Sequence, residues 1–443
     1  MTNLLLSYYG DDFTGSTDVM EALASRGVST VLFLGIPTTD MRRRFADCRA
    51  MGIAGTSRSE TPGWMEANLG PAFEWLRSLS ADVTHYKVCS TFDSSPGIGS
   101  VGRAIEIGRE LFQQSCVPLV VGAPQLKRYT CFGNLFAAYQ GHVYRIDRHP
   151  VMSRHPVTPM DEADLVRHLS KQTELPIALA DLATLVAPRS SQVLDKLVEE
   201  ASVLMLDVDG PQTQHAVGRE LWRLVRKGQR FVVGSSGIEY ALLEAWREEG
   251  LLGEAVEFAP PGKVERLAVV SGSVSPTTER QIRAALKDGF DGIDLDPVSL
   301  LSDPEAEIRQ ALERAERVLR SGRSVILHTA LGPKADRGAD IDHVAGARHL
   351  IGQYLGDILR RLVESEGLPR AVIAGGDTSS HALKKLHVDA LTTLLPLPQT
   401  PGSPLCTAHG AYPPTDGLQI ALKGGQVGGD DYFSQIRDGQ SHR

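Results

Sequence analysis

Two adjacent aspartates, Asp11 and Asp12, follow the first apolar segment of the chain and stand in a short polar turn. Such a carboxylate pair could bind a sugar hydroxyl, act as a general base, or hold a cation with the help of Thr14. A structural alternative is that Asp12, Thr14 or Ser16 caps the helix that follows. Capping accounts for one acid but not for two, so we interpret Asp11 and Asp12 as candidate catalytic residues.

Two basic residues, Arg58 and Lys87, follow the third and the fourth expected strand of the chain. A guanidinium offers a planar fork and an ammonium a point charge, so the two could clamp a small carboxylate. Each residue alone is explained as well by an ordinary surface charge, but their shared position at strand ends favours a binding site. Cys89 has no partnering base in its neighbourhood, and we interpret it as a buried structural thiol.

A loop with three prolines, residues 149–160, is expected to be rigid and therefore preorganised. It could present Arg154 or His155 to a ligand. A purely structural turn explains the same residues equally well.

Three glycine-rich turns in the second half of the chain, residues 271–276, 375–380 and 423–429, each follow an expected strand. Glycine lets backbone N–H groups approach a ligand closely, and helix N-termini favour anions, so the three turns together suggest a nucleotide phosphate site. A single glycine turn is also ordinary punctuation between elements. The hypothesis therefore depends on the convergence of the turns at one edge of a sheet.

Several familiar signatures are absent from the sequence. It has no G-x-x-x-x-G-K-[ST] motif, and no G-x-G-x-x-G lies in the first strand–turn–helix, which disfavours P-loop enzymes and dinucleotide-binding dehydrogenases. No G-x-S-x-G elbow or H-E-x-x-H motif is present either.

These turns lie on alternating strand and helix patterns, which predict an α/β fold with largely parallel sheets. The expected strands are 4–9, 30–34, 51–54, 85–88, 119–121, 203–208, 231–233, 267–270, 324–328, 371–374 and 418–422. The expected helices are 17–26, 72–79, 101–113, 238–248 and one that ends at Gly367. The first two strands and the helix between them are interpreted as one βαβ unit.

The chain of 443 residues is long enough for two or three domains. A Pro/Gly segment around residues 260–262 interrupts both periodicities and is interpreted as a linker. We therefore expect two α/β domains, at 1–258 and 263–443, with an active-site cleft between them.

The amino-acid composition indicates which classes of partner and which cellular compartment to expect. Lys and Arg total 46 against 54 Asp and Glu, a net charge of −8, and no long basic run is present, so we expect no nucleic-acid partner. The uncharged stretch 390–415 is broken by prolines and the N-terminus lacks a cationic leader, so we expect no membrane insertion or export. The five cysteines are odd in number and widely spaced, which is typical of a reducing, cytoplasmic protein.

Six motifs in order resemble the four-carbon acid sugar kinase family, over nearly the whole chain. They are residues 10–15, 87–94, 155–160, 271–273, 375–379 and 422–425. The resemblance implies an N-terminal domain that binds the acid sugar, a C-terminal domain that binds ATP, and transfer of phosphate to the terminal hydroxyl of the sugar. Mg²⁺ is the implied second cofactor, with no ligands assigned.

The resemblance also implies roles for single residues. Contacts to the sugar are implied for Asp11, Asp12, Arg58, Lys87, Ser90 and Thr91. Contacts to ATP are implied for Ser271, Ser273, Gly375, Gly376, Asp377, Thr378, Ser379, Gly424 and Gly425. Because both ligands are anions and the chain is acidic, we expect local positive potential from Arg58, Lys87, Lys423 and the helix N-termini.

The departures from the family pattern indicate a branch. Gly10, Asp377 and the 423–428 ending are variants similar to those of 3-oxo-isoapionate kinases, while residues 89–94 look more like the 3-oxo-tetronate kinases. The expected activity is an ATP-dependent kinase for a 3-oxo-tetronate, the branched 3-oxo-isoapionate or a related tetronate. Two other classes stay open: a non-catalytic acid-sugar-binding or regulatory protein, and a sugar-phosphate isomerase or lyase. Assembly into a homo-oligomer also stays open.

Overall fold

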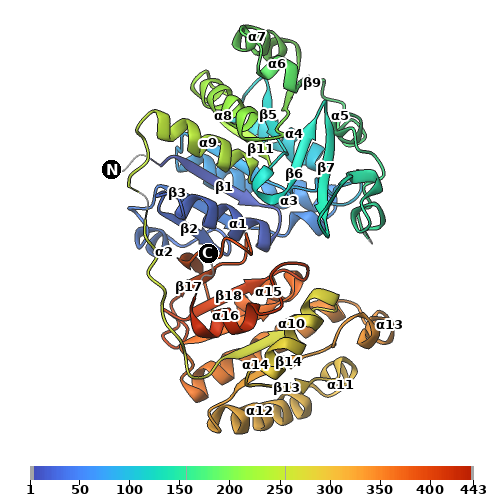
Figure 1. Ribbon diagram of the computed structural model, residues 1–443, viewed down its shortest axis with the longest axis vertical. Helices are drawn as coiled ribbons and strands as arrows, with labels where there is room; N and C mark the ends of the chain where they lie inside the picture. Colours follow the sequence, from blue (N-terminus) through green and yellow to red (C-terminus); the bar gives the residue numbers. More distant parts are fainter. Residues whose placement is uncertain (1–3, 156, 255, 441–443) are drawn as a thin grey trace. The chain divides into compact units, whose positions relative to one another are not determined.

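The computed structural model describes residues 4–155, 157–254 and 256–440 (Figure 1). The chain divides into two compact units. Unit 1 consists of Met1–Thr30 and Phe45–Val256, and unit 2 consists of Val31–Arg44 and Glu257–Arg443. The expected second domain, 263–443, thus gains an early segment of the chain.

Unit 1 is built on a parallel sheet in the order β3-β1-β4-β11-β5-β10-β9. Its strands are β1 (Leu6–Gly10), β3 (Ala50–Ala54), β4 (Val83–Lys87), β5 (Val117–Val120), β9 (Ile177–Ala180), β10 (Val203–Leu206) and β11 (Phe231–Gly234). Its helices are α1 (Phe13–Ala24), α3 (Pro62–Ser78), α4 (Val101–Phe112), α5 (Leu165–Leu169), α6 (Leu182–Leu185), α7 (Ser190–Glu200), α8 (Pro211–Arg226) and α9 (Gly237–Glu248). All of these strands except the edge strand β9 are buried, as both faces of a parallel sheet usually are.

An antiparallel ribbon in unit 1 was not expected from the sequence. It consists of β6 (Arg128–Cys131), β7 (Asn134–Tyr139) and β8 (His142–Arg145). Each of its two turns places an ordinary residue and then a glycine at positive φ, Phe132–Gly133 and Gln140–Gly141. Two successive residues of this kind make the tight turn that joins antiparallel strands, and the second position favours glycine.

Unit 2 has a mixed sheet in the order β13-β14-β12-β15-β18-β17-β16-β2. Strands β13 to β18 in this order run parallel, and β17, β16 and β2 continue it antiparallel. The strands are β2 (Thr30–Phe33), β12 (Ala268–Ser271), β13 (Phe290–Asp294), β14 (Ser324–His328), β15 (Arg370–Ala374), β16 (Ala390–Leu395), β17 (Leu405–His409) and β18 (Gln419–Lys423). The helices are α2 (Thr39–Arg43), α10 (Pro276–Lys287), α11 (Pro297–Ser302), α12 (Pro304–Arg320), α13 (Gly338–Ile341), α14 (Ala347–Glu366), α15 (Gly376–Lys385) and α16 (Tyr432–Asp438).

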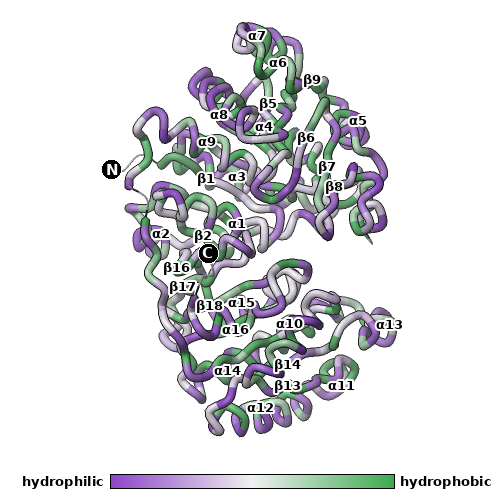
Figure 2. The backbone as a smooth tube through the Cα atoms, in the orientation of Figure 1, coloured by the Kyte–Doolittle hydropathy of each residue, from purple (hydrophilic) through white to green (hydrophobic). Residues whose placement is uncertain are grey.

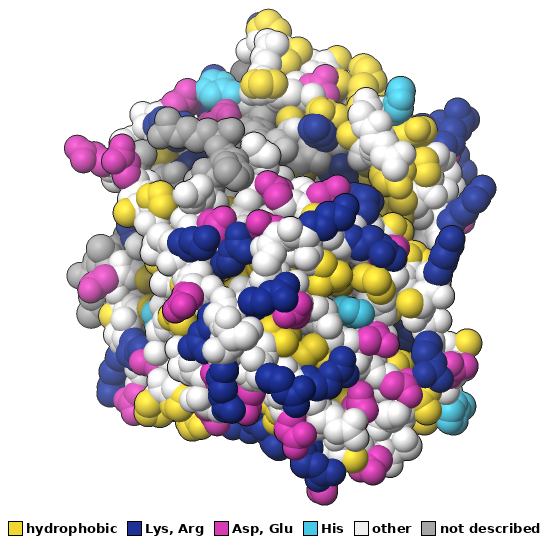
Figure 3. Space-filling view, turned by 60° about the horizontal axis from the view of Figure 1, so that its bottom comes forward, with side chains coloured by type: hydrophobic (Ala, Val, Ile, Leu, Met, Phe, Trp, Pro, Cys, Tyr) yellow, Lys and Arg dark blue, Asp and Glu magenta, His cyan; other side chains and the backbone are white. Residues whose placement is uncertain are grey.

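The outer helices are amphipathic. Figure 2 shows α8 and α12 alternating along their length between hydrophilic and hydrophobic residues, as helices do when one face packs on a sheet. On the face shown in Figure 3, Lys and Arg side chains are interspersed with Asp and Glu. No helix among the described residues is both long and apolar enough to cross a membrane.

The expected pairing of the first two strands is wrong. β1 pairs with β3 and β4, whereas β2 pairs antiparallel with β16, through Leu32 with Leu391 and Phe33 with Ala390. Arg44, just after α2, bonds Asp416 at 3.0 Å. The strand itself was expected correctly, but β16 is more than 350 residues away in the sequence, and local periodicity carries no record of that pairing.

Two helices begin earlier than expected because their caps lie earlier. Asp12 caps α1 and Thr61 caps α3, which therefore start at Phe13 and Pro62 instead of residues 17 and 72. The predicted class, two α/β units with largely parallel sheets, is confirmed.

Candidate active site

The acidic turn of unit 1 is organised around Arg58, which lies in the single turn Ser57–Ser59 directly after β3. Its guanidinium donates to Asp11 Oδ1 at 2.7 Å and Oδ2 at 3.1 Å, and to Asp12 Oδ1 at 2.8 Å and Oδ2 at 2.9 Å. Asp12 Oδ1 also accepts a hydrogen bond of 2.8 Å from the backbone of Gly15. Asp12 can therefore cap the helix and still take part in a functional site.

This arrangement changes what Arg58 can do. All three nitrogens of its guanidinium already donate to the two aspartates, so its first task is to hold Asp11 and Asp12 side by side. Two carboxylates so close would otherwise repel each other. Burial raises the pKa of Asp11, and Arg58 opposes that shift.

The surroundings of Lys87 differ from those of Arg58. It is the last residue of β4, its side chain is buried with 2% of the residue exposed, and its carbonyl accepts from the backbone of Asp11 at 2.9 Å. Among the residues that the structure describes, no hydrogen-bond or ion-pair partner faces its ammonium. A Cβ at Gly15 would lie 2.8 Å from Lys87 Nζ, so this glycine is what lets the ammonium reach the acidic turn.

The segment after Lys87 is held by its own side chains. The Thr91 hydroxyl lies 2.6 Å from Asp93 Oδ1 and 2.8 Å from Cys89 Sγ. Burial raises the pKa of Cys89, which keeps it a thiol and agrees with its structural interpretation. Ser90 is buried beside it.

The structure does not bring Arg154 and His155 to the acidic turn through any hydrogen bond or ion pair of the described residues. Arg154 is exposed at the end of a single turn, Met152–Arg154. His155 Nδ1 accepts from the backbone of Thr158 at 3.1 Å, which closes a local turn. Pro156, between these residues, lies outside the described residues.

Below the acidic turn lies a buried cluster that sequence reasoning missed. His85 Nδ1 lies 2.6 Å from Glu239 Oε1, and both side chains are fully buried. Burial raises the pKa of Asp18, and the charge of Lys87 opposes that shift. His85 and Lys87 are two residues apart on one strand, so their side chains face the same side of the sheet. This spacing is the signal in the sequence that could have pointed to His85.

In unit 2 the glycine turns meet at one edge of the sheet, because β12, β15 and β18 are neighbouring parallel strands. A Cβ at Gly272 would lie 2.4 Å from Thr378 Oγ1, and one at Gly375 would lie 2.7 Å from the same atom. A Cβ at Gly425 would lie 3.2 Å from Ser273 Oγ. A side chain at Gly272 or Gly375 would therefore force Thr378 to shift, and one at Gly425 would make a tight contact with Ser273.

The hydroxyl groups of these turns mostly stabilise the turns themselves. Ser271 Oγ accepts from the backbone of Ser273 at 3.4 Å, and Ser379 Oγ donates to the carbonyl of Gly375 at 2.7 Å. The N-cap residue of α15 is Gly375, which has no side chain to bond the first N–H groups of the helix. These N–H groups of the ten-residue helix are therefore available to an anion. Gly376 begins the helix, and the side chain of Asp377 lies outside the described residues.

Lys423 connects the third glycine turn to the start of α10. It is fully buried at the end of β18, and its Nζ donates to the carbonyl of Gly424 at 2.7 Å and to Thr278 Oγ1 at 3.1 Å. Burial lowers its pKa to about 7. Thr278, in the first turn of α10, was not among the expected site residues.

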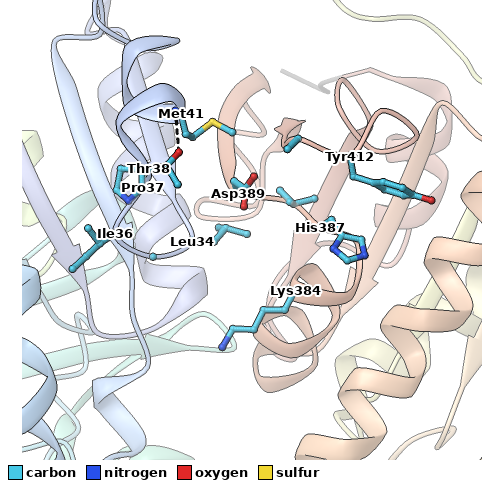
Figure 4. Close-up of a pocket in the computed structure, with 12 residues that line it drawn as sticks. Leu34, Ile36, Pro37, Thr38, Met41, Lys384, His387, Asp389 and Tyr412 are labelled. Carbon is cyan, nitrogen blue, oxygen red and sulfur yellow. Dashed lines mark hydrogen bonds between the residues drawn. The ribbon is translucent and has the colours of Figure 1, made fainter.

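Unit 2 also contains a cavity of about 110 Å³ beside the glycine turns and a larger one of about 590 Å³. The larger cavity, drawn in Figure 4, lies between the end of β2 and the start of β16, with Ile36, Lys384, His387 and Tyr412 around it. Residues just before β16 lie at the amino ends of the parallel strands, because β16 runs in the same direction as β18. Ligands of such sheets bind at the carboxyl ends, and the larger cavity lies at the opposite end of the strands from the glycine turns.

No group of three or more His, Cys, Asp and Glu side chains within the described ranges could hold a metal ion. Mg²⁺ in phosphoryl-transfer sites is held largely by phosphate oxygens with one or two carboxylates. The donor set is therefore compatible with an ion that arrives with a nucleotide.

Two family models match this chain, one in each half of the sequence. Residues 6–242 match the model of a sugar-binding N-terminal domain, and residues 268–433 match that of a nucleotide-binding C-terminal domain.

Curated relatives match along the whole chain. A 3-oxo-isoapionate kinase of Paraburkholderia graminis is 45% identical, over 99% of this chain and 95% of the relative. A 3-oxo-tetronate kinase of Methylobacterium radiotolerans is 32% identical, over 98% of this chain and 99% of the relative. A solved structure from Salmonella typhimurium LT2, described as a putative tRNA synthase, shares the fold with a TM-score of 0.79 at 24% identity, over 98% of each chain. The chain therefore belongs to the four-carbon acid sugar kinase family.

Proposed function

We propose that this protein transfers the γ-phosphoryl group of ATP to the terminal hydroxyl of a short 3-oxo acid sugar, with 3-oxo-isoapionate as the first substrate to test. The observation that carries the proposal is the meeting of three glycine turns at the carboxyl ends of β12, β15 and β18. Identity of 45% to a 3-oxo-isoapionate kinase, against 32% to a 3-oxo-tetronate kinase, supports the choice of substrate.

In this proposal unit 2 binds the nucleotide. The open N-terminus of α15 and the backbone of the turns 271–275 and 423–425 offer N–H groups to the phosphates. Lys423, held by Thr278 and Gly424, adds a positive charge when it is protonated. Catalysis then consists mainly of positioning and charge neutralisation at the transferring phosphoryl group.

Unit 1 binds the sugar. Lys87 makes no direct hydrogen bond or ion pair within the described ranges, so its ammonium is the group best suited to the substrate carboxylate, because the guanidinium of Arg58 is already engaged by two acids. Asp12 orients the hydroxyl and accepts its proton. Its side chain is 26% exposed, against 7% for Asp11, so a substrate reaches it more readily. Asp11 holds Arg58 in place.

Mg²⁺ would come bound to ATP and would neutralise charge on the phosphates when present. The described residues supply no protein-only cage for it. Asp11 and Asp12 remain committed to Arg58 in this arrangement.

The test is an ADP-release assay with ATP and a panel of 3-oxo-isoapionate, 3-oxo-tetronates, threonate and erythronate. We expect ADP release with at least one 3-oxo acid. Conversion of a sugar without nucleotide would point to the isomerase or lyase class, and sugar binding without ADP release to a binding protein.

Asp12→Asn tests the catalytic assignment. Asparagine is as good a helix cap as aspartate, so the turn should keep its fold. If Asp12 accepts the proton, kcat should fall by about 10²-fold or more. A matching melting temperature of the variant is the control, and an unchanged kcat would remove Asp12 from this role.

A further inference from the structure

We propose that Arg128 is a second cation of the sugar site, which binds the carboxylate of the acid sugar together with Lys87. The inference rests on the proposed function and adds a residue that no motif of the sequence addresses. Arg128 is the first residue of β6, in the antiparallel ribbon of unit 1 that was not expected from the sequence.

The ribbon begins at the edge of the sheet where the acidic turn lies. Ala123, just after β5, exchanges two backbone hydrogen bonds with Arg128, at 2.9 and 3.1 Å. The backbone of Thr130 donates to the carbonyl of Val208, just after β10, at 2.8 Å. β5 and β10 belong to the same parallel sheet as β1 and β4. Arg128 is therefore fixed at the carboxyl ends of the strands, where ligands of such sheets bind.

The charge of Arg128 is not balanced by an acid among the described residues. Burial lowers the pKa of this half-buried side chain, and the groups that oppose the shift are Cys89 and Tyr129, neither of which is a carboxylate. Burial and the charge of Arg128 together lower the pKa of His149. A half-buried guanidinium without an acid is costly in the free protein, and an anionic ligand would complete it.

The hydrogen bonds of Arg128 leave one edge of its guanidinium without an acceptor. Nη1 donates to the carbonyl of Leu126 at 2.9 Å and to that of Lys127 at 3.2 Å. Nε is buried without a partner, and Nη2 makes no hydrogen bond within the described ranges. Nε and Nη2 form an edge that can meet both oxygens of a carboxylate. Arg58 lacks such an edge, because all three of its nitrogens donate to aspartates.

Cys89 connects Arg128 to the rest of the sugar site. Charge interactions join this thiol with Lys87 as well as with Arg128. Cys89 also directly precedes Ser90 and Thr91, for which contacts to the sugar are expected. The ribbon and β4 therefore bring their two cations to the same segment of the chain.

Two cations of different shape suit the carboxylate of an acid sugar. A guanidinium holds both oxygens and fixes the plane of the group, whereas an ammonium adds a point charge. A sugar held in this way at its acid end presents its terminal hydroxyl to Asp12. The neutral sugar alcohol of the same length would leave both cations unpaired, so the pair would select for an acid.

Arg128→Met tests the proposal, with Arg128→Lys as the conservative variant. Because methionine removes the charge, we expect KM for the acid sugar to rise about tenfold or more, and KM for ATP to stay within about twofold. Lysine keeps the charge without the fork, so Arg128→Lys should regain part of the lost affinity. Arg145→Met is the matched control. It alters β8 of the same ribbon, where Arg145 is paired with Asp147 at 2.8 Å, and both KM values should stay within about twofold.

Hydrogen exchange of the unaltered protein gives a second test that needs no variant. Each acid sugar of the panel that binds should slow amide exchange in residues 87–94 and 123–131. Protection of 87–94 without protection of 123–131 would overturn the role of Arg128, as would an unchanged KM for the acid sugar in both folded Arg128 variants. An unaltered protein that releases no ADP with any sugar of the panel would contradict the proposed function, and the exchange measurement would still decide whether Arg128 binds the acid.

Discussion

Arg58 follows β3 and Lys87 is the last residue of β4, the two strands that flank β1, yet the fold gives their charges different surroundings. Arg58 is neutralised by Asp11 and Asp12, while the Lys87 ammonium makes no direct hydrogen bond or ion pair among the described residues and interacts with Asp11 and Asp18 through its charge alone. A buried charge without a partner is costly unless a ligand completes it. The distinction depends on side-chain directions and could not be predicted from residue types.

Lys87→Met should therefore weaken sugar binding and leave the fold intact. Because methionine keeps the length of the side chain without its charge, we expect KM for the acid sugar to rise about tenfold or more and KM for ATP to stay within about twofold. The melting temperature is measured as well, because removing Lys87 leaves the buried carboxyls of Asp11 and Asp18 without its opposing charge. A rise in both KM values together would show that Lys87 does not belong to the sugar site.

Lys423 should make ATP binding depend on pH. Burial lowers its pKa to about 7, and the negative triphosphate favours the protonated form. At pH 8 the free protein holds a largely neutral lysine, so ATP binding should take up a proton. Calorimetry in two buffers of different ionisation enthalpy measures this uptake, which Lys423→Met should abolish.

The same shift predicts the pH dependence of stability. Between pH about 7 and the ordinary value of 10.5 the unfolded chain binds a proton that the folded chain does not. Stability of the unaltered protein should therefore rise with pH over this range relative to Lys423→Met. Parallel stability profiles of the two proteins would contradict the assignment.

At the scale of elements, the proposed phosphate site is formed by the backbone of turns and not by side chains. Gly375 has φ of 124° and a Cβ there would lie 2.7 Å from Thr378 Oγ1, whereas a Cβ at Gly376 would meet nothing within 4 Å. Glycine is thus explained differently at these two adjacent positions. The first is required by conformation and close approach, and the second leaves open space beside the helix N-terminus.

Alanine at these two positions should separate the effects. Gly375→Ala should lower the melting temperature of the free protein, because both its φ and its neighbours are unfavourable. Gly376→Ala should be neutral or stabilising by up to about 1 kcal/mol, because alanine is the better helix former. Thermal unfolding without ligands measures both, and a Gly376→Ala variant as unstable as Gly375→Ala would contradict this reading.

At the scale of the whole molecule, residues 31–44 decide how the chain divides. Although they come early in the sequence, β2 and α2 belong to unit 2, where β2 pairs with β16. Without them β16 would become an exposed edge strand, which is a site of aggregation.

A fragment of residues 257–443 should therefore be less stable and less soluble than the same fragment with a peptide of residues 31–44 added. The peptide should raise the melting temperature and reduce light scattering. A peptide of reversed sequence is the control. A fragment that is soluble and unaffected by the peptide would show that β2 is not needed to cover β16.

The sequence by itself determined the alternation of strands and helices, the acidic turn at Asp11 and Asp12 and the order of the motifs. These follow from local periodicity and turn chemistry, which each segment carries alone. Only the tertiary structure decided that Arg58 binds both aspartates, that Lys423 is buried between turns, and that β2 pairs with β16. Such contacts join residues far apart in the chain, and their partners are chosen by packing and charge in three dimensions, which no local pattern records.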